Sequence, residues 1–226
     1  MLVLAQAVLG DGLAELDGEM RKAWPKNRAV HFVFHGHSVP AGYHVTPDVR
    51  PFESYPHLVH VEMKRRYPLA VINAIVTAIG GENSVAGAAR FEADVLRHKP
   101  DVVLIDYALN DRRLPLEQVE AAWREMIGKC KAAGVAVVLL TPTGDSSADM
   151  TREDDPLRVR ADLVRRVAKD EGVMLADVAA AWLAEIAAGT PESEFLSQVN
   201  HPNLRGHELA AKEIFRALEG GGIAMP

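Results

Sequence analysis

Residues 29–38 have the sequence AVHFVFHGHS, a mostly apolar run that ends in glycine, histidine and serine. Such a run is typical of a parallel β-strand buried on both faces of its sheet. Four more apolar segments follow, each after a Pro or Gly turn signal: Leu69–Val76, Val102–Tyr107, Val135–Leu140 and Val173–Asp177. Helical patterns lie between and after them: Tyr55–Tyr67, Val85–His98, Leu116–Ala133, Pro156–Glu171, Val178–Ala188 and Asn203–Leu218. This alternation predicts an α/β fold, a three-layer α/β/α sandwich with a five-stranded parallel sheet.

The length of 226 residues and the 48% apolar content favour a single domain over residues 1–226, with 1–28 as an N-terminal helical extension. Met1–Leu9 is mostly apolar, but it has no preceding positive charge and no convincing cleavage site, and acidic residues follow it. No apolar run is long enough to cross a bilayer. We therefore expect a cytoplasmic protein without a membrane span, while the alternative of an export leader trimmed from the chain stays open.

The charge balance argues against a nucleic-acid partner. The chain has 25 basic and 31 acidic residues, a net charge of −6 and no run of lysine or arginine. Its single cysteine, Cys130, excludes an intrachain disulfide and the usual zinc–cysteine spacings. We predict no cofactor and no metal, and the sequence gives no indication of the oligomeric state.

Polar residues follow the predicted strands at positions that suit acyl chemistry. Ser38 follows the first strand, Gly80-Gly81 the second and Asn110 the third, and His201 lies beyond the fifth. The carboxyl ends of parallel strands share one edge of a sheet, which is where such folds build their sites. A hydroxyl, an amide and an imidazole at one edge can act as nucleophile, oxyanion donor and base.

Four blocks in chain order resemble the SGNH, or GDSL-like, esterase and acylhydrolase superfamily: FHGHSVPAG at 34–42, IGGENS at 79–84, ALND at 108–111 and VNHPNLRGH at 199–207. The resemblance implies a flavodoxin-like SGNH hydrolase fold and a serine hydrolase that cleaves small acyl or acetyl esters through an acyl-enzyme. It further implies that Ser38 is the nucleophile and His201 the base. The implied oxyanion donors are Asn110 and Gly81, with Gly80 as the alternative to Gly81.

Three positions depart from the family pattern. His37 replaces the aspartate before the nucleophile, Ala108 replaces a glycine, and Gln198 replaces the acid three residues before the histidine. That acid normally fixes the imidazole tautomer and stabilises the imidazolium. We expect Gln198 to accept a hydrogen bond from the ring and orient it without supplying charge. Glu194 and Asp177 are alternative acids that the spacing does not distinguish.

Other hypotheses remain open at this point. Gly144-Asp145-Ser146 matches the family's nucleophile motif letter for letter, but it follows the fourth strand, so we favour Ser38. His35 and His37 at a strand end are a possible pair of zinc ligands in a metal-dependent hydrolase. A non-catalytic binding module on the same fold is the third hypothesis, and the expected partner of an enzyme is a small-molecule, carbohydrate or lipid ester.

Overall fold

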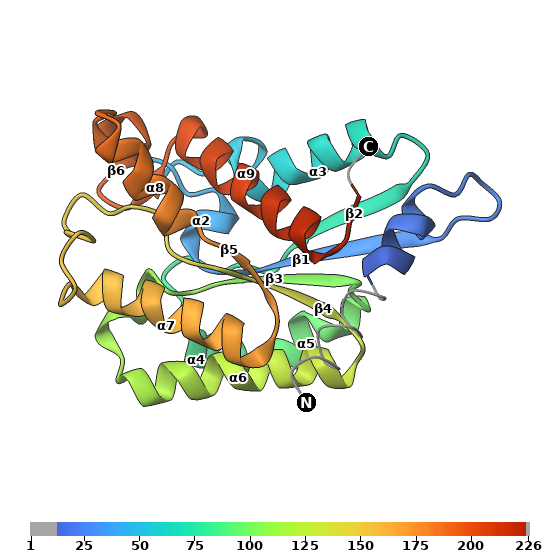
Figure 1. Cartoon of the computed structure of the whole chain (residues 1–226), viewed down its shortest axis with the longest axis horizontal. Coiled ribbons are helices and arrows are strands. Elements are labelled where there is room, and N and C mark those ends of the chain that lie inside the picture. Colours follow the sequence, from blue (N-terminus) through green and yellow to red (C-terminus); the bar gives the residue numbers. More distant parts are fainter. Residues whose placement is uncertain (1–12, 225–226) are drawn as a thin grey trace.

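A computed structural model describes residues 13–224. Its centre is a five-stranded parallel sheet in the order β2-β1-β3-β4-β5 (Figure 1). The strands are β1 (Ala29–Gly36), β2 (Val71–Val76), β3 (Val102–Asp106), β4 (Ala136–Leu140) and β5 (Met174–Ala176). They coincide with the five predicted apolar runs to within about two residues, which confirms the predicted fold class.

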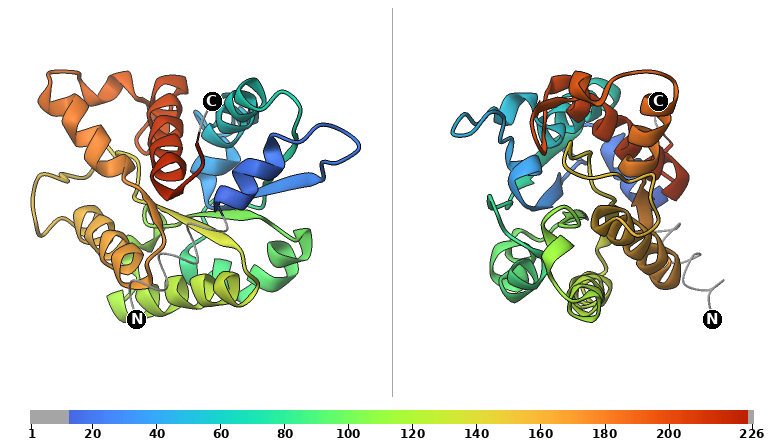
Figure 2. Two further views of the ribbon diagram at one scale, coloured as in Figure 1. Left: turned by 45° about the vertical axis from the view of Figure 1, so that its right-hand side comes forward. Right: turned by 90° about the vertical axis from the view of Figure 1, so that its left-hand side faces the viewer.

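Helices cover both faces of this sheet, and Figure 2 shows the same layering from two further directions. The longer helices on one face are α3 (Tyr55–Arg66), α8 (Val178–Ala187) and α9 (Leu204–Gly221). Those on the other face are α4 (Ser84–Ala89), α5 (Phe91–Asp94), α6 (Leu116–Ala132) and α7 (Pro156–Glu171). Short 3₁₀-helices lie at Pro51–Glu53 (η1), Leu96–His98 (η2), Asn110–Arg113 (η3) and Glu192–Glu194 (η4).

Local signals explain where the helices begin and end. In α7 the side chain of Asp155 accepts hydrogen bonds from the N–H groups of Leu157 and Arg158, and Pro156 is the first helical residue. The helix ends at Gly172, whose φ of +62° is a left-handed conformation that glycine adopts without strain. Both ends of this helix agree with the sequence prediction.

The predicted helix Val85–His98 is wrong as a continuous element, because it is interrupted at Arg90. That residue has φ −104° and ψ 4°, outside helical geometry, and it separates α4 from α5. The guanidinium of Arg90 instead turns back to the loop after β2, where it binds Glu82 and the carbonyl of Thr77. Tertiary hydrogen bonding has therefore overridden the helical periodicity.

Successive residues of β1 face opposite helical layers. Phe32 and Phe34 pack in the hydrophobic cluster that contains α3 and α9, and Val33 packs in the cluster that contains α6. This two-residue alternation aims His35 and the residues after it into different layers of the molecule. The polar side chains at the carboxyl end of β1 therefore lie on both sides of the sheet.

A two-stranded antiparallel hairpin follows η4 and was not expected from the sequence. It consists of β6 (Leu196–Gln198) and β7 (His201–Pro202), and it pairs Gln198 with His201 across the hairpin. Figure 1 shows β6 at the end of the molecule where α2 (Ser38–Ala41) also lies. The hairpin thus brings the late histidine back to the end of β1.

The predicted N-terminal extension is described only in part. Residues 13–20 are helical, and Leu13, Leu16 and Met20 are buried in the cluster that also contains α9. Residues 1–12 lie outside the described part of the chain. Among residues 13–224 there is no helix with the length and apolar content needed to cross a membrane.

Candidate active site

Ser38 is the first residue of α2, directly after β1. The last residue of β1, Gly36, approaches β3 closely because it has no side chain. A Cβ at this position would lie 2.5 Å from the carbonyl oxygen of Asp106 in β3. His37 caps the short helix, since its Nδ1 accepts a hydrogen bond of 3.2 Å from the N–H of Val39. The Ser38 hydroxyl is therefore held at a tight strand-to-helix junction.

The structure brings His201 to Ser38 across 163 positions of sequence. The His201 Nε2 and Ser38 Oγ atoms are 3.0 Å apart, and both residues are 7% exposed. Burial lowers the pKa of His201 from its ordinary value, and the neighbouring rings of His37 and His44 act in the same direction. The imidazole is consequently neutral at pH 7, the state in which Nε2 can accept a proton.

Two groups face the other ring nitrogen, Nδ1, of His201. The carbonyl oxygen of His44 lies 2.9 Å away, and Nε2 of Gln198 lies 2.6 Å away. The Gln198 amide is oriented by Thr46, whose backbone N–H donates to Oε1 at 3.0 Å and whose Oγ1 accepts from Nε2 at 3.1 Å. The amide therefore presents its NH₂ to the ring, contrary to the expectation that Gln198 accepts from it.

The two alternative acids lie elsewhere. Glu194 pairs with Arg205, with 3.2 Å between Oε2 and Nη1, and its side chain is exposed. Asp177 caps α8 and binds Arg165. Neither carboxylate contacts His201, so the acceptor available to Nδ1–H is the backbone carbonyl of His44.

The predicted oxyanion donors lie on two adjacent loops. Asn110 is the first residue of η3, and its Nδ2 donates to the carbonyl oxygen of Glu82 at 2.8 Å. Gly81 has a φ of +79°, and a Cβ there would meet no atom within 4 Å, so the backbone at this position borders open space. Within residues 13–224 the backbone N–H groups of Ser38 and Gly81 have no hydrogen-bond acceptor.

Gly80 has a different environment from Gly81. A Cβ on Gly80 would lie 2.8 Å from the phenol ring of Tyr43, and the centroid of that ring is 5.7 Å from the centroid of the His201 ring. The N–H of Ile79 donates to the carbonyl oxygen of Gly36 at 3.0 Å. The loop after β2 is thus tied to the strand that leads to Ser38.

Comparison with known proteins identifies the family of the chain. The GDSL-like lipase/acylhydrolase family model matches residues 34–209, more than half of the chain. The chain belongs to this family. It is therefore an enzyme of the class that hydrolyses esters.

Individual relatives cover most of the chain. An acetylxylan esterase from Geobacillus stearothermophilus is 26% identical over 168 residues, 67% of this chain and 74% of the relative. A crystal structure of an acetylxylan esterase from that organism has a TM-score of 0.71 at 22% identity and covers 84% of this chain and 94% of its own. An α/β hydrolase enzyme from the metagenome of Lake Arreo, Spain, also has a TM-score of 0.71, at 24% identity over 90% of this chain and 99% of its own.

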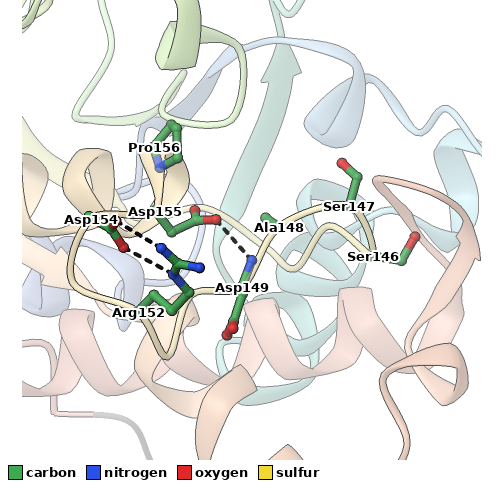
Figure 3. Close-up of a pocket in the computed structure, with 8 residues that line it drawn as sticks. All are labelled: Ser146, Ser147, Ala148, Asp149, Arg152, Asp154, Asp155 and Pro156. Atoms are coloured by element: carbon green, nitrogen blue, oxygen red, sulfur yellow. Dashed lines mark hydrogen bonds and ion pairs between the residues drawn. The ribbon is translucent and has the colours of Figure 1, made fainter.

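The Gly-Asp-Ser match in this GDSL-like enzyme lies on the loop after β4. Figure 3 shows Ser146 at one end of this loop, which lines a pocket of about 490 Å³ together with Asp149, Arg152 and Asp155. The Ser146 hydroxyl donates to the carbonyl oxygen of Val199 at 3.3 Å. Within residues 13–224 no imidazole is hydrogen-bonded to this hydroxyl, in contrast to that of Ser38.

The two histidines of the metal hypothesis are committed to different partners. His35 Nδ1 lies 2.9 Å from Thr77 Oγ1, and its Nε2 lies 3.0 Å from the hydroxyl of Tyr107. His37 lies next to Asp106. No group of three or more His, Cys, Asp or Glu side chains within residues 13–224 is arranged to hold a metal ion. The geometry gives the metal hypothesis no support.

A buried acid next to the residues around Ser38 was missed by the sequence analysis. His37 Nε2 and Asp106 Oδ1 are 3.3 Å apart, an ion-pair distance without hydrogen-bond alignment, and the hydroxyl of Tyr55 donates to Asp106 Oδ2 at 3.0 Å. Asp106 was detectable as the only charged residue in its predicted strand. It lies against the side chain of His37, which caps the helix that begins at Ser38.

Proposed function

We propose that this enzyme hydrolyses esters of small acyl groups, with Ser38 as the nucleophile and an acyl-enzyme as the intermediate. The observation that carries the proposal is the 3.0 Å approach of His201 Nε2 to Ser38 Oγ at the carboxyl edge of the sheet. A histidine within hydrogen-bond reach of a serine hydroxyl is the arrangement that activates an otherwise weak nucleophile.

The proposed reaction has two steps. Ser38 Oγ attacks the carbonyl carbon while its proton passes to His201 Nε2, and the carbonyl oxygen becomes an oxyanion. The N–H groups of Ser38 and Gly81 and the side-chain amide of Asn110 donate to this oxyanion. The tetrahedral intermediate expels the alcohol, which takes its proton from His201. Water then gives a proton to His201 and attacks the acyl-enzyme. The second tetrahedral intermediate releases the carboxylic acid and Ser38, whose Oγ takes the proton back from His201.

We propose that a backbone carbonyl takes over the orienting role of the acid in the usual triad, without its charge. The His44 carbonyl accepts from Nδ1–H, which leaves Nε2 unprotonated and ready to act as base. The NH₂ of Gln198 favours the opposite tautomer, because a donor at Nδ1 stabilises the ring form that carries its proton on Nε2. We propose that Ser38 and His201 work as a dyad and that Gln198 weakens the base.

The surroundings favour a polar alcohol. An open, shallow depression adjoins the His44 loop, and its lining includes Arg50, Glu53, Asn203 and Arg205. Charged and amide groups suit the hydroxyls of a carbohydrate better than a lipid chain. A related enzyme is an acetylxylan esterase, which supports acetylated carbohydrate as the substrate class.

The decisive experiment combines labelling with turnover. A fluorophosphonate probe is expected to label the wild type and the Ser146→Ala variant, and not the Ser38→Ala variant. Hydrolysis of aryl esters is expected to follow the same pattern and to fall as the acyl group lengthens beyond acetyl. Labelling of the Ser38→Ala protein, or an unlabelled and inactive wild type, would refute the assignment, and the second result would favour a non-catalytic binding module.

A further inference from the structure

Glu82 lies immediately after Gly81, and its nearly buried carboxylate is held from two sides. Arg90 binds it with both Nε and Nη2, with 2.8 Å between Nε and Oε1, and the hydroxyl of Tyr107 donates to Oε2 at 2.7 Å. Burial opposes the charge on Arg90, but the paired carboxylate outweighs it and raises the pKa of the guanidinium. A bidentate ion pair of this kind fixes orientation as well as charge.

A chain of hydrogen bonds extends from this carboxylate into the core. Because the Tyr107 hydroxyl donates to Glu82, its oxygen is free to accept from Nε2–H of His35, which also lies 3.2 Å from the carbonyl oxygen of Gly87. The other ring nitrogen of His35, Nδ1, lies 2.9 Å from the hydroxyl of Thr77. Burial lowers the pKa of His35 to about 4 and raises that of Tyr107, so both are neutral at pH 7. The bonds from His35 to Tyr107 and from Tyr107 to Glu82 both run toward the carboxylate, and such consecutive hydrogen bonds strengthen one another.

The local structure is adapted to this network. A Cβ on Gly87 would lie 2.3 Å from the hydroxyl oxygen of Tyr107, so the approach of α4 to that ring requires glycine. The interruption between α4 and α5 falls at Arg90, whose Nη2 also donates to the carbonyl of Thr77 at 2.7 Å. The helix break at Arg90 and the glycine at position 87 therefore both allow the contacts that hold the Glu82 carboxylate.

The backbone of Glu82 connects the network to the active site. Its carbonyl oxygen accepts from Asn110 Nδ2 at 2.8 Å, and its peptide unit follows Gly81. A side-chain amide carries two N–H groups in one plane. A bond to one of them fixes the direction of the other, which is the group that would donate to an oxyanion.

We propose that Glu82 is a positioning residue for the oxyanion hole, holding both the Gly81 peptide and the Asn110 amide through one anchored residue. The proposal rests on the function proposed above. Oxyanion donors act because they are preorganised toward charge that develops in the transition state. Loss of the anchor should therefore lower kcat and leave substrate binding nearly unchanged.

The test is a double-mutant cycle in the full chain. Glu82→Gln is expected to lower kcat about tenfold with KM changed less than about twofold. In an Asn110→Ala background the same substitution is expected to lower kcat clearly less than tenfold, because only the part of its effect that passes through the Gly81 peptide remains. Tyr107→Phe, which removes only a hydroxyl, is expected to act in the same direction with a smaller loss.

Asp94→Asn is the matched control, since Asp94 contacts the same Arg90 through Nη1 at 3.1 Å but has no bond to the loop. It is expected to keep wild-type kcat. Equal losses from Glu82→Gln in both backgrounds, a pure KM effect, or a lowered melting temperature with intact kcat would overturn the inference while activity still depends on Ser38. Activity that survives Ser38→Ala would instead refute the proposed function.

Discussion

Replacing Gln198 by glutamate should convert the proposed Ser38–His201 dyad into a triad. The substitution is isosteric, so it places a carboxylate oxygen at the position of Nε2, 2.6 Å from His201 Nδ1. The neighbours of the present amide accept the change, because the N–H and the hydroxyl of Thr46 can both donate to a carboxylate. Aspartate, one methylene shorter, would not reach Thr46 and the ring together.

The expected shift in the pKa of His201 follows from the geometry. Unit charges centred about 4 Å apart interact by about 4 kcal/mol at an effective dielectric constant of about 20, which corresponds to about three pKa units. The Gln198 side chain is half-buried, and water weakens the interaction, so we expect a shift of about one to two units. The carboxylate also stabilises the imidazolium and the productive tautomer, and kcat above the pKa should rise about tenfold to a hundredfold.

The assay is a pH profile of kcat/KM for a small aryl ester, which reports the pKa of the base in the free enzyme. Burial lowers the pKa of His201 in the wild type, so its acidic limb should lie below the ordinary histidine value of about 6.5. A carboxylate favours the charged ring and raises this pKa, so the limb of Gln198→Glu should move to higher pH.

Two control variants show whether the shift of the acidic limb comes from the added charge at position 198. Gln198→Met removes the competing NH₂ without adding charge, and its limb should stay near that of the wild type. Glu194→Gln should leave both limb and rate unchanged, since Glu194 pairs with Arg205. An unmoved limb and unchanged kcat in Gln198→Glu, or collapse of activity in Glu194→Gln, would refute the proposed surroundings of His201.

Three further predictions follow from single contacts. Asn110→Ala should lower kcat about a hundredfold with little change in KM in steady-state assays, and a pure KM effect would assign Asn110 to substrate binding. Gly36→Ala should lower the melting temperature by several degrees, because a Cβ would meet the backbone oxygen of Asp106 at 2.5 Å and overpacking costs about 1–3 kcal/mol. Burial raises the pKa of Cys130 to about 12, so iodoacetamide at pH 8 should modify this thiol only after unfolding, and rapid labelling of the folded enzyme would contradict its burial.

The sheet was predictable because its central strands are buried on both faces. Val102–Asp106 and Ala136–Leu140 are apolar at every position but one, and such runs leave few alternatives between their turn signals. The hairpin was not predictable, since β6 and β7 have only three and two residues and no alternating pattern. Its register nevertheless decides which side chain faces His201.

The parts of the candidate site that consist of particular side chains were predictable from the sequence. Ser38 and His201 have family-like sequence contexts, and the positions of both depend on the ends of recognisable elements. The acceptor for Nδ1 is a backbone carbonyl, which any residue at position 44 would supply and which therefore leaves no trace in the sequence. The orientation of the Gln198 amide depends on Thr46, 152 positions away, and such pairings follow only from the folded chain.

The distance in sequence between the two halves of the dyad has a consequence for synthesis. Ser38 emerges from the ribosome with the first strand of the sheet, while His201 arrives only after all five strands. A nascent chain with a partly built sheet carries the hydroxyl without its base, and it cannot attack ester metabolites or acylate itself through this pair. Chains of this size commonly fold through partly structured intermediates. On the proposed mechanism, docking of the hairpin Leu196–Pro202 brings the base to the hydroxyl, and the appearance of activity marks the completion of folding.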